Sequence, residues 1–130
     1  MSVYVDASAA AKLLIEEAES PALGEHLDRV AADGAAIVAS TLLETELRRL
    51  AVREELAQSA VSDLLDRIDL AEPNKSLFYE AGILPGRRLR SLDALHLATA
   101  IRLEADEIVA YDQRLAEAAR SVGLQVTMPA

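Results

Sequence analysis

The sequence predicts a three-layer α/β/α fold with a mostly parallel central sheet. Short apolar strand candidates alternate with amphipathic helix candidates along the chain, and the strands are only about four or five residues long. Strands that alternate with helices pair in parallel through right-handed crossovers, which place helices on both faces of the sheet. The 130 residues contain no linker, repeat or low-complexity tract, so we expect a single domain spanning residues 1–130.

The first half of the chain has clear signals for the start and end of each element. Ser8 is placed to cap a helix directly after the first strand, and Pro21 stands at a helix start that Gly34 ends. Either Ser40 or Thr41 could cap the helix that follows the second strand. The predicted strands are residues 2–5 and 36–39, and the predicted helices are residues 9–15, 20–33, 42–55 and 56–67.

The second half repeats the alternation, with its weakest signals at the beginning. A short helix is predicted to close near Gly82, ahead of a Pro-Gly-Arg-Arg turn at residues 85–88. Gly123 is suited to end the last helix, because glycine adopts the left-handed conformation common at helix C-termini. The predicted strands are residues 68–70, 108–111 and 124–128, and the predicted helices are residues 74–81, 91–103 and 113–122.

The composition predicts a soluble, cytoplasmic protein without a membrane segment. Hydrophobic residues make up 52% of the chain, but charges interrupt every apolar stretch before it reaches the ~18 residues that a membrane span needs. The N-terminal residues 1–6 contain no basic residue and end in an acid, which does not fit a secretory signal.

The lack of cysteine restricts the chemistry. Disulfides, thiolate metal sites and cysteine nucleophiles are excluded, so carboxylates, histidine or backbone oxygens would have to hold any metal. Oxygen ligands favour Mg²⁺ or Mn²⁺.

The charge pattern argues for local rather than general affinity for nucleic acid. A formal charge of −9 opposes non-specific phosphate binding. Arginines nevertheless gather in two places and could make bidentate phosphate contacts, although a solvated helix face and a polar loop would have the same pattern. The two clusters are Arg48, Arg49 and Arg53, and Arg87, Arg88 and Arg90.

Four acidic residues are predicted to meet at one edge of the sheet. Asp6 and Asp112 each follow an apolar strand, and the functional crevice of an open parallel sheet lies beyond the carboxyl ends of its strands. Asp93 in the first turn of one helix, and Glu46 in another helix that starts at this edge, can face the same place. Such carboxylates would repel one another unless a cation lay between them.

Each acid also has a purely structural interpretation. Asp6 and Asp112 could cap helices or turns. Asp93 could complement its helix dipole, and Glu46 could be a surface residue.

Four segments, in order along nearly the whole chain, resemble the motifs of PIN domains. The third and fourth are long and specific, whereas the first is short and the second leaves Glu44 as a competitor of Glu46, which we prefer because of its Glu-Leu-Arg context. The segments are Val5-Asp6-Ala7-Ser8, Leu43-Glu44-Thr45-Glu46-Leu47-Arg48-Arg49, Ser91 to Ala100 and Val109 to Ala119.

The resemblance implies a metal-dependent endoribonuclease acting as a VapC-type toxin of a toxin–antitoxin pair. Asp6, Glu46 and Asp93 would then be the principal metal ligands, with Asp112 completing the pocket. It also implies an RNA substrate, a cognate antitoxin and a homodimer. Basic residues of an antitoxin would suit an acidic pocket. The alternative is a PIN-like binding or scaffold protein without turnover.

Two serines and two histidines are further candidates for polar roles. Ser8 and Ser40 could orient a water or a carboxylate, or simply cap helices. His96 lies one turn after Asp93, and a hydrogen-bonded core histidine is favoured over a ligand. His26 is predicted to be exposed without a partner.

Two other enzyme or signalling classes fit less well. A haloacid-dehalogenase-type phosphatase needs a second Asp two residues after its nucleophile, where this chain has Ser8. A response-regulator receiver domain needs a Lys near the end of its last strand, and only Lys12 and Lys75 are present.

Overall fold

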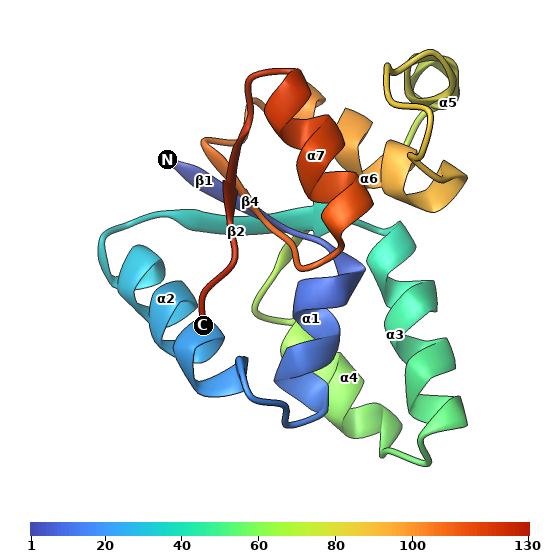
Figure 1. Cartoon of the computed structure of the whole chain (residues 1–130). Coiled ribbons are helices and arrows are strands. Elements are labelled where there is room, and N and C mark those ends of the chain that lie inside the picture. The colour runs from blue at the N-terminus through green and yellow to red at the C-terminus, as the bar shows by residue number, and fades with distance from the viewer.

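The computed structural model describes residues 1–130, which form five strands and seven helices (Figure 1). The strands are β1 (Ser2–Val5), β2 (Ala36–Ser40), β3 (Asp69–Ala71), β4 (Glu107–Val109) and β5 (Gln125–Thr127). The helices are α1 (Ala7–Leu14), α2 (Ser20–Ala32), α3 (Leu42–Arg53), α4 (Gln58–Leu65), α5 (Lys75–Gly82), α6 (Ser91–Arg102) and α7 (Gln113–Ser121).

The five strands form one sheet in the order β3-β2-β1-β4-β5, and every pair is parallel. The central strand β1 aligns Val3 with Ile37 of β2 on one side and with Glu107 of β4 on the other. The chain moves outward from β1 to β3 and then returns to build β4 and β5 on the opposite side. The winding therefore reverses between β1 and β4, and a crevice forms outside such a switch point.

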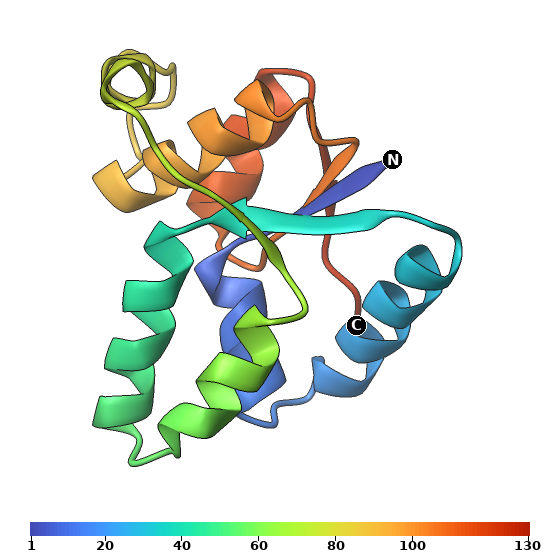
Figure 2. The ribbon, with the colours of Figure 1, turned by 180° about the vertical axis from the view of Figure 1, so that it is seen from behind.

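Helices cover both faces of the sheet. Helices α1, α2, α3 and α4 lie on one side, and α6 and α7 lie on the other (Figures 1 and 2). Helix α5 packs on the outside of α6, away from the sheet. The three-layer α/β/α fold predicted from the alternation of strands and helices is confirmed. None of the helices has the length and apolar character of a membrane-crossing segment.

The core lies between the sheet and its two helical layers. Strand β1 buries Val3, Tyr4 and Val5 completely, as expected for a central parallel strand that is covered on both faces. These three side chains belong to a cluster of 25 buried hydrophobic residues. Helices α5 and α6 form a separate small cluster, which consists of Leu77, Ala81, Ala94 and Ala98.

Two local predictions need correction. Asp6, rather than Ser8, caps α1, because its carboxylate accepts the Ala9 amide at 2.9 Å. Strand β4 begins at Glu107 and ends at Val109, earlier than predicted. Its end is earlier because the Tyr111 amide donates to the Ser8 hydroxyl at 2.8 Å and so leaves the sheet.

Candidate metal centre

The structure places two predicted acids at the carboxyl ends of neighbouring strands. Asp6 directly follows β1, and Asp112 lies three residues beyond the end of β4. The two strands pair in parallel up to Val5 and Val109, so both residues lie at the switch point of the sheet. The edge of the sheet that was predicted to bear the site is therefore the one that carries them.

Asp6 is held rigidly and is only 2% exposed. Besides the Ala9 amide, its carboxylate accepts the Ser8 hydroxyl, with Oγ at 2.7 Å from Oδ1 and 2.9 Å from Oδ2. The pKa of Asp6 is raised to about 6, mainly by burial and to a smaller extent by the negative charge of Asp93, against the lowering effect of these hydrogen bonds. Asp6 is thus a costly place for an uncompensated negative charge.

Ser8 links the two loops that carry Asp6 and Asp112. Its hydroxyl donates to the Asp6 carboxylate and accepts the Tyr111 amide at 2.8 Å. Of the two roles considered for Ser8, the structure shows that of orienting a carboxylate, while the cap belongs to Asp6. Ser40, the other candidate, accepts the Leu42 amide through its hydroxyl at 3.1 Å at the start of α3.

Asp112 caps α7 with only one of its oxygens. Oδ1 accepts the amides of Arg114 and Leu115 at 2.9 and 3.0 Å, and Oδ2 has no hydrogen bond within the protein. Capping and metal binding therefore do not exclude each other at this residue. The cap fixes the carboxylate and leaves its second oxygen available.

The charges of several neighbouring residues affect the pKa of Asp93. This residue lies in the first turn of α6 and makes no side-chain hydrogen bond. Partial burial raises the pKa of Asp93, and the charges of Asp112 and Glu46 raise it further, while His96 and Arg90 oppose the shift. Asp93 is thus electrostatically linked to two predicted site residues, and the raised pKa of Asp6 links it to the third.

Glu46 and Glu44, the two competitors of the second motif, have different surroundings. Glu44 is exposed and pairs with Arg48 one turn later at 3.0 Å. Glu46 instead accepts His96 Nε2 at 2.6 Å through Oε1, and its Oε2 has no hydrogen bond within the protein. Glu46, and not Glu44, lies near enough to Asp93 for its charge to raise the pKa of that acid. Asp6, Glu46, Asp93 and Asp112 are called the acidic cluster below.

His96 is buried, as predicted, but it is also a direct neighbour of the acidic cluster. It is 1% exposed, and its Nδ1 lies 2.7 Å from the hydroxyl of Tyr4. The same hydroxyl accepts the Ser40 amide at 3.1 Å. Sequence reasoning missed Tyr4, although a phenol inside an apolar central strand signals a buried hydrogen-bond partner.

The donor set fits a hard divalent cation. No three acidic or histidine groups lie close enough together to form a ready three-ligand sphere. The cluster instead offers outward oxygens, with Asp112 Oδ2, Glu46 Oε2 and the whole Asp93 carboxylate free of protein hydrogen bonds. All of its donors are carboxylate oxygens, which Mg²⁺ and Mn²⁺ prefer.

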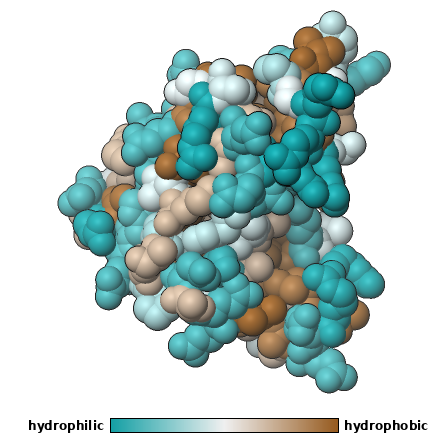
Figure 3. Space-filling model, in the orientation of Figure 1, coloured by the Kyte–Doolittle hydropathy of each residue, from teal (hydrophilic) through white to brown (hydrophobic).

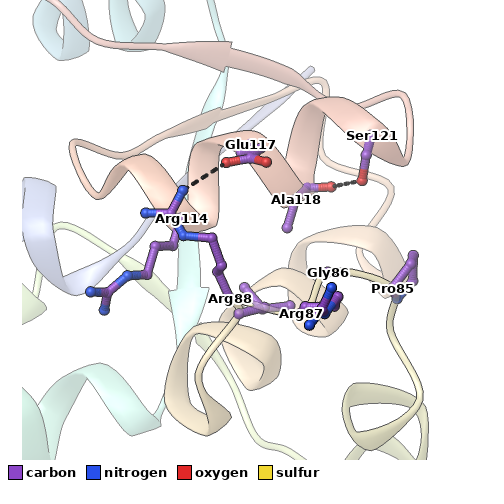
Figure 4. Close-up of a pocket in the computed structure, with 9 residues that line it drawn as sticks. Pro85, Gly86, Arg87, Arg88, Arg114, Glu117, Ala118 and Ser121 are labelled. Carbon is purple, nitrogen blue, oxygen red and sulfur yellow. Dashed lines mark hydrogen bonds and ion pairs between the residues drawn. The ribbon is translucent and has the colours of Figure 1, made fainter.

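A groove rich in arginine lies beside α6 and α7. It has a volume of about 650 Å³ and lies between the loop after α5 and one face of α7. Figure 4 shows Arg88 reaching across it to Glu117, 3.5 Å away, with Arg87 and Arg114 also in its wall. This groove, with its three arginines, is called the arginine groove. Arg48, from the other predicted cluster, donates hydrogen bonds to Gln58 and Ser62 at 3.1 and 3.2 Å.

An apolar groove of about 520 Å³ begins next to Glu46. Figure 3 shows apolar surface near α1 and α3 on this face of the molecule. The lining combines small and apolar side chains of these helices with Leu92 of α6, and Arg49 and Arg53 supply positive charge along it.

His26 corrects a prediction. It was expected to be exposed without a partner, but its Nε2 lies 2.8 Å from Oε1 of the buried Glu107. The partner is 81 residues away along the chain, so the polar neighbours of His26 in the sequence gave no sign of it.

The sequence has relatives over almost its full length. The family model described as the PIN domain matches residues 3–121. Ribonuclease VapC46 of Mycobacterium tuberculosis is 37% identical over 131 residues, which cover 98% of each chain. Ribonuclease VapC35 of the same organism is 38% identical over 135 residues, covering 98% of this chain and 96% of the relative.

Solved structures share the fold at much lower identity. VapC20 of Mycobacterium tuberculosis, a toxin that cleaves the sarcin–ricin loop, has a TM-score of 0.74 at 17% identity, covering 98% of this chain and 99% of that one. VapBC2 of Rickettsia felis, solved with a DNA fragment from its promoter, gives 0.73 at 16% identity, with 98% of both chains covered. At these identities the likeness concerns the fold alone.

Proposed function

Because the chain belongs to the PIN-domain family, and within it to the VapC ribonucleases, we propose that its acidic cluster holds the divalent cation used to hydrolyse RNA. The protein is a ribonuclease and the toxin of a toxin–antitoxin pair. PIN-domain ribonucleases generally depend on a divalent metal, and the proposal assigns that metal to four residues. These residues are Asp6, Glu46, Asp93 and Asp112.

The mutual repulsion within the acidic cluster carries the proposal. Asp6 is buried with a pKa raised to about 6, and its neighbour Asp93 also has a raised pKa, in part because of Asp112 and Glu46. Ionised carboxylates that repel one another are stabilised when a cation lies between them. The donors of the acidic cluster are carboxylate oxygens, which prefer hard cations. Mg²⁺ or Mn²⁺ is therefore the proposed cofactor.

The residues of the cluster have distinct proposed roles. Asp6 is buried and fixed by Ser8 and the start of α1, so it would hold the cation from the buried side. Asp112 and Glu46 each present one oxygen while the protein holds the other. A bound divalent cation polarises the phosphodiester and lowers the pKa of water, so that no protein nucleophile is needed. Asp93 is half-buried and its side chain makes no hydrogen bond within the protein, so its whole carboxylate would be free for the cation or its waters.

The arginine groove is the proposed contact for the RNA backbone. The protein carries a net charge of −9, so RNA has to be drawn to a local concentration of positive charge. Arg87 and Arg88 are exposed in the loop that leads into α6, the helix that carries Asp93. Arginine contacts phosphate oxygens bidentately, which orients a strand as well as attracting it.

An antitoxin is the proposed protein partner. The apolar groove starts next to Glu46, so a segment seated in it could bring an Arg or Lys to the acidic cluster and compete with the cation. A homodimer and a cytoplasmic location remain predictions from the sequence.

Cleavage of structured RNA by the purified, antitoxin-free protein tests the proposal. Cuts are expected with Mn²⁺ or Mg²⁺, and none with a chelator or with the Asp6→Asn variant. Cleavage that survives both chelation and Asp6→Asn would remove the acidic cluster from the reaction. No cleavage in any lane, at matched folding and several RNA substrates, would favour a binding protein without turnover.

A further inference from the structure

A continuous hydrogen-bonded chain runs from the backbone of β2 to the acidic cluster. It passes from the Ser40 amide to the Tyr4 hydroxyl at 3.1 Å, and from there to His96 Nδ1 at 2.7 Å. On the other side of the ring, His96 Nε2 lies 2.6 Å from Glu46 Oε1. The links join residues that are 36, 92 and 50 positions apart in the sequence, so the chain exists only in the folded protein.

The surroundings of Tyr4 favour one direction for the hydrogen bonds in this chain. A backbone amide can only donate, so the Tyr4 oxygen accepts from Ser40. The fully buried phenol must place its own hydrogen on an acceptor. His96 Nδ1 lies 2.7 Å away, and the Thr99 side chain is the other polar group near the hydroxyl. Burial raises the pKa of Tyr4 above its ordinary value, so the phenol keeps that hydrogen.

The imidazole then carries its hydrogen on Nε2, which donates a hydrogen bond to Oε1 of Glu46. We propose, building on the metal-dependent cleavage proposed above, that His96 is a positioning residue for the metal site. It is held by Tyr4 in the Nε2-protonated form and fixes Oε1 of Glu46, so that Oε2, which has no protein partner, would be free to bind the cation. Partners of this kind set the orientation of a ligating carboxylate, and their loss commonly weakens metal binding roughly 10- to 100-fold.

The packing around His96 supports a role in orientation. The imidazole stands edge-on to the Tyr4 ring, with ring centroids 5.8 Å apart and an interplanar angle of 71°. Its exposed fraction is 1%, and α6 holds it between residues of the core. A ring confined in this way cannot turn to follow a mobile Glu46, so it imposes its own direction on the carboxylate.

Calorimetric titration of the RNA-free protein with Mn²⁺ tests the proposal. His96→Leu removes both ring nitrogens and should weaken Mn²⁺ binding roughly 10- to 100-fold. His96→Gln, whose amide nitrogen can replace Nε2 as donor, should restore most of that affinity. His26→Leu is the matched control, because it breaks the other His–Glu pair, with Glu107, and should leave the affinity for Mn²⁺ unchanged.

A second measurement follows the tautomer of His96 directly. Nitrogen NMR of the histidine-labelled protein should show a bare Nδ1 and a protonated Nε2 at neutral pH. Tyr4→Phe should release this preference and weaken Mn²⁺ binding severalfold without leaving a large cavity. In cleavage assays with limiting Mn²⁺, His96→Leu should lower kcat far more than it changes KM for RNA.

The outcomes separate this proposal from the one on which it rests. Wild-type protein that binds no Mn²⁺ would overturn both. Wild-type binding that His96→Leu and Tyr4→Phe leave unchanged would overturn the positioning role alone. A proton on Nδ1 of His96 would overturn the hydrogen-bond directions, and if His96→Leu fails to fold, Tyr4→Phe and the tautomer decide.

Discussion

The two histidine–glutamate pairs of this molecule differ in what the glutamate does with its second oxygen. At the start of β4, Glu107 accepts His26 through Oε1 and the Thr127 hydroxyl through Oε2, at 2.8 and 2.6 Å. At the carboxyl end of the sheet, Glu46 accepts only His96, and its other oxygen has no protein partner. The first pair completes its own hydrogen bonding and serves the fold, whereas the second leaves an oxygen for a ligand.

The same contrast extends to the charges around each pair. Near Glu107 the structure supplies a donor for each carboxylate oxygen. Asp6 and Asp93 have raised pKa values because they are buried and because negative charges surround them. One end of the sheet is thus arranged for stability, and the other carries an electrostatic cost that the proposed cation would remove.

The largest expected difference between the two ends lies in cleavage. Asp93→Asn should lower RNA cleavage by roughly a thousandfold or more, because a metal site supplies several kcal/mol of transition-state stabilisation. The Glu107→Gln variant, changed at the other end, should cleave RNA at nearly the wild-type rate when the rate is expressed per folded protein. Circular dichroism should show that both variants are folded. Turnover by a folded Asp93→Asn protein would exclude Asp93 from the mechanism.

The next difference concerns stability as a function of pH in the absence of metal. Because the pKa of Asp6 is about 6 in the folded state against 3.8 as the reference, the folded protein binds more protons between these values. Its stability should therefore fall as pH rises through this window. Asp6→Asn should remove this fall and stabilise the protein at pH 7 by up to about 3 kcal/mol.

Denaturant unfolding at pH 4 and pH 7, with a chelator present, measures this effect. The two proteins should be nearly equal at pH 4 and differ at pH 7. A wild-type protein whose stability rises over this window would contradict the raised pKa of Asp6. Added Mn²⁺ should reduce the difference at pH 7, because it stabilises only the folded wild-type site.

A smaller effect of opposite sign is expected at Glu107. Glu107→Gln should destabilise the protein by about 1 to 2 kcal/mol, since a buried carboxylate that accepts two donors is replaced by a group that can accept one of them. Glu46→Gln should change stability less, because only one donor depends on it. Thermal unfolding of both variants decides the point, and equal losses would remove the contrast between the two pairs.

The smallest expected effect concerns RNA affinity. Arg87→Ala with Arg88→Ala should weaken binding roughly tenfold and reduce the salt dependence, because about two phosphate contacts are lost. Arg29→Ala with Arg120→Ala is the matched control, since both arginines are exposed in the last turns of their helices, which lead into strand starts. Binding measured at several salt concentrations tests this, and equal losses in the two double variants would indicate a general charge effect.

Sequence alone sufficed for the layers and the direction of the sheet. Short apolar runs such as residues 2–5 and 36–39 have one physical solution when helices separate them, namely parallel strands buried on both faces. The ends of elements were less predictable. Strand β4 ends at Val109 because the Ser8 hydroxyl, distant in sequence, takes the Tyr111 amide.

The surroundings of the acids were beyond the reach of sequence patterns. The sequence predicts Asp6 as either a cap or a site residue, yet its carboxylate caps α1 and also lies near enough to Asp93 for that charge to raise its pKa. The partners of His26 and His96 are far away along the chain, so neither hydrogen bond leaves a local signature. Spacing can place a residue at an edge of the sheet, but burial and partners arise from packing.

The separate packing of α5 gives the molecule two levels of mobility. Helix α5 is attached to α6 through the four-residue cluster of Leu77, Ala81, Ala94 and Ala98, outside the main core. Its amides should therefore exchange with solvent hydrogen through local opening, well before those of β1. The loop with Arg87 and Arg88 follows this helix, while Asp6 directly follows the fully buried strand β1. The proposed RNA contact would thus combine an adaptable rim with a fixed centre.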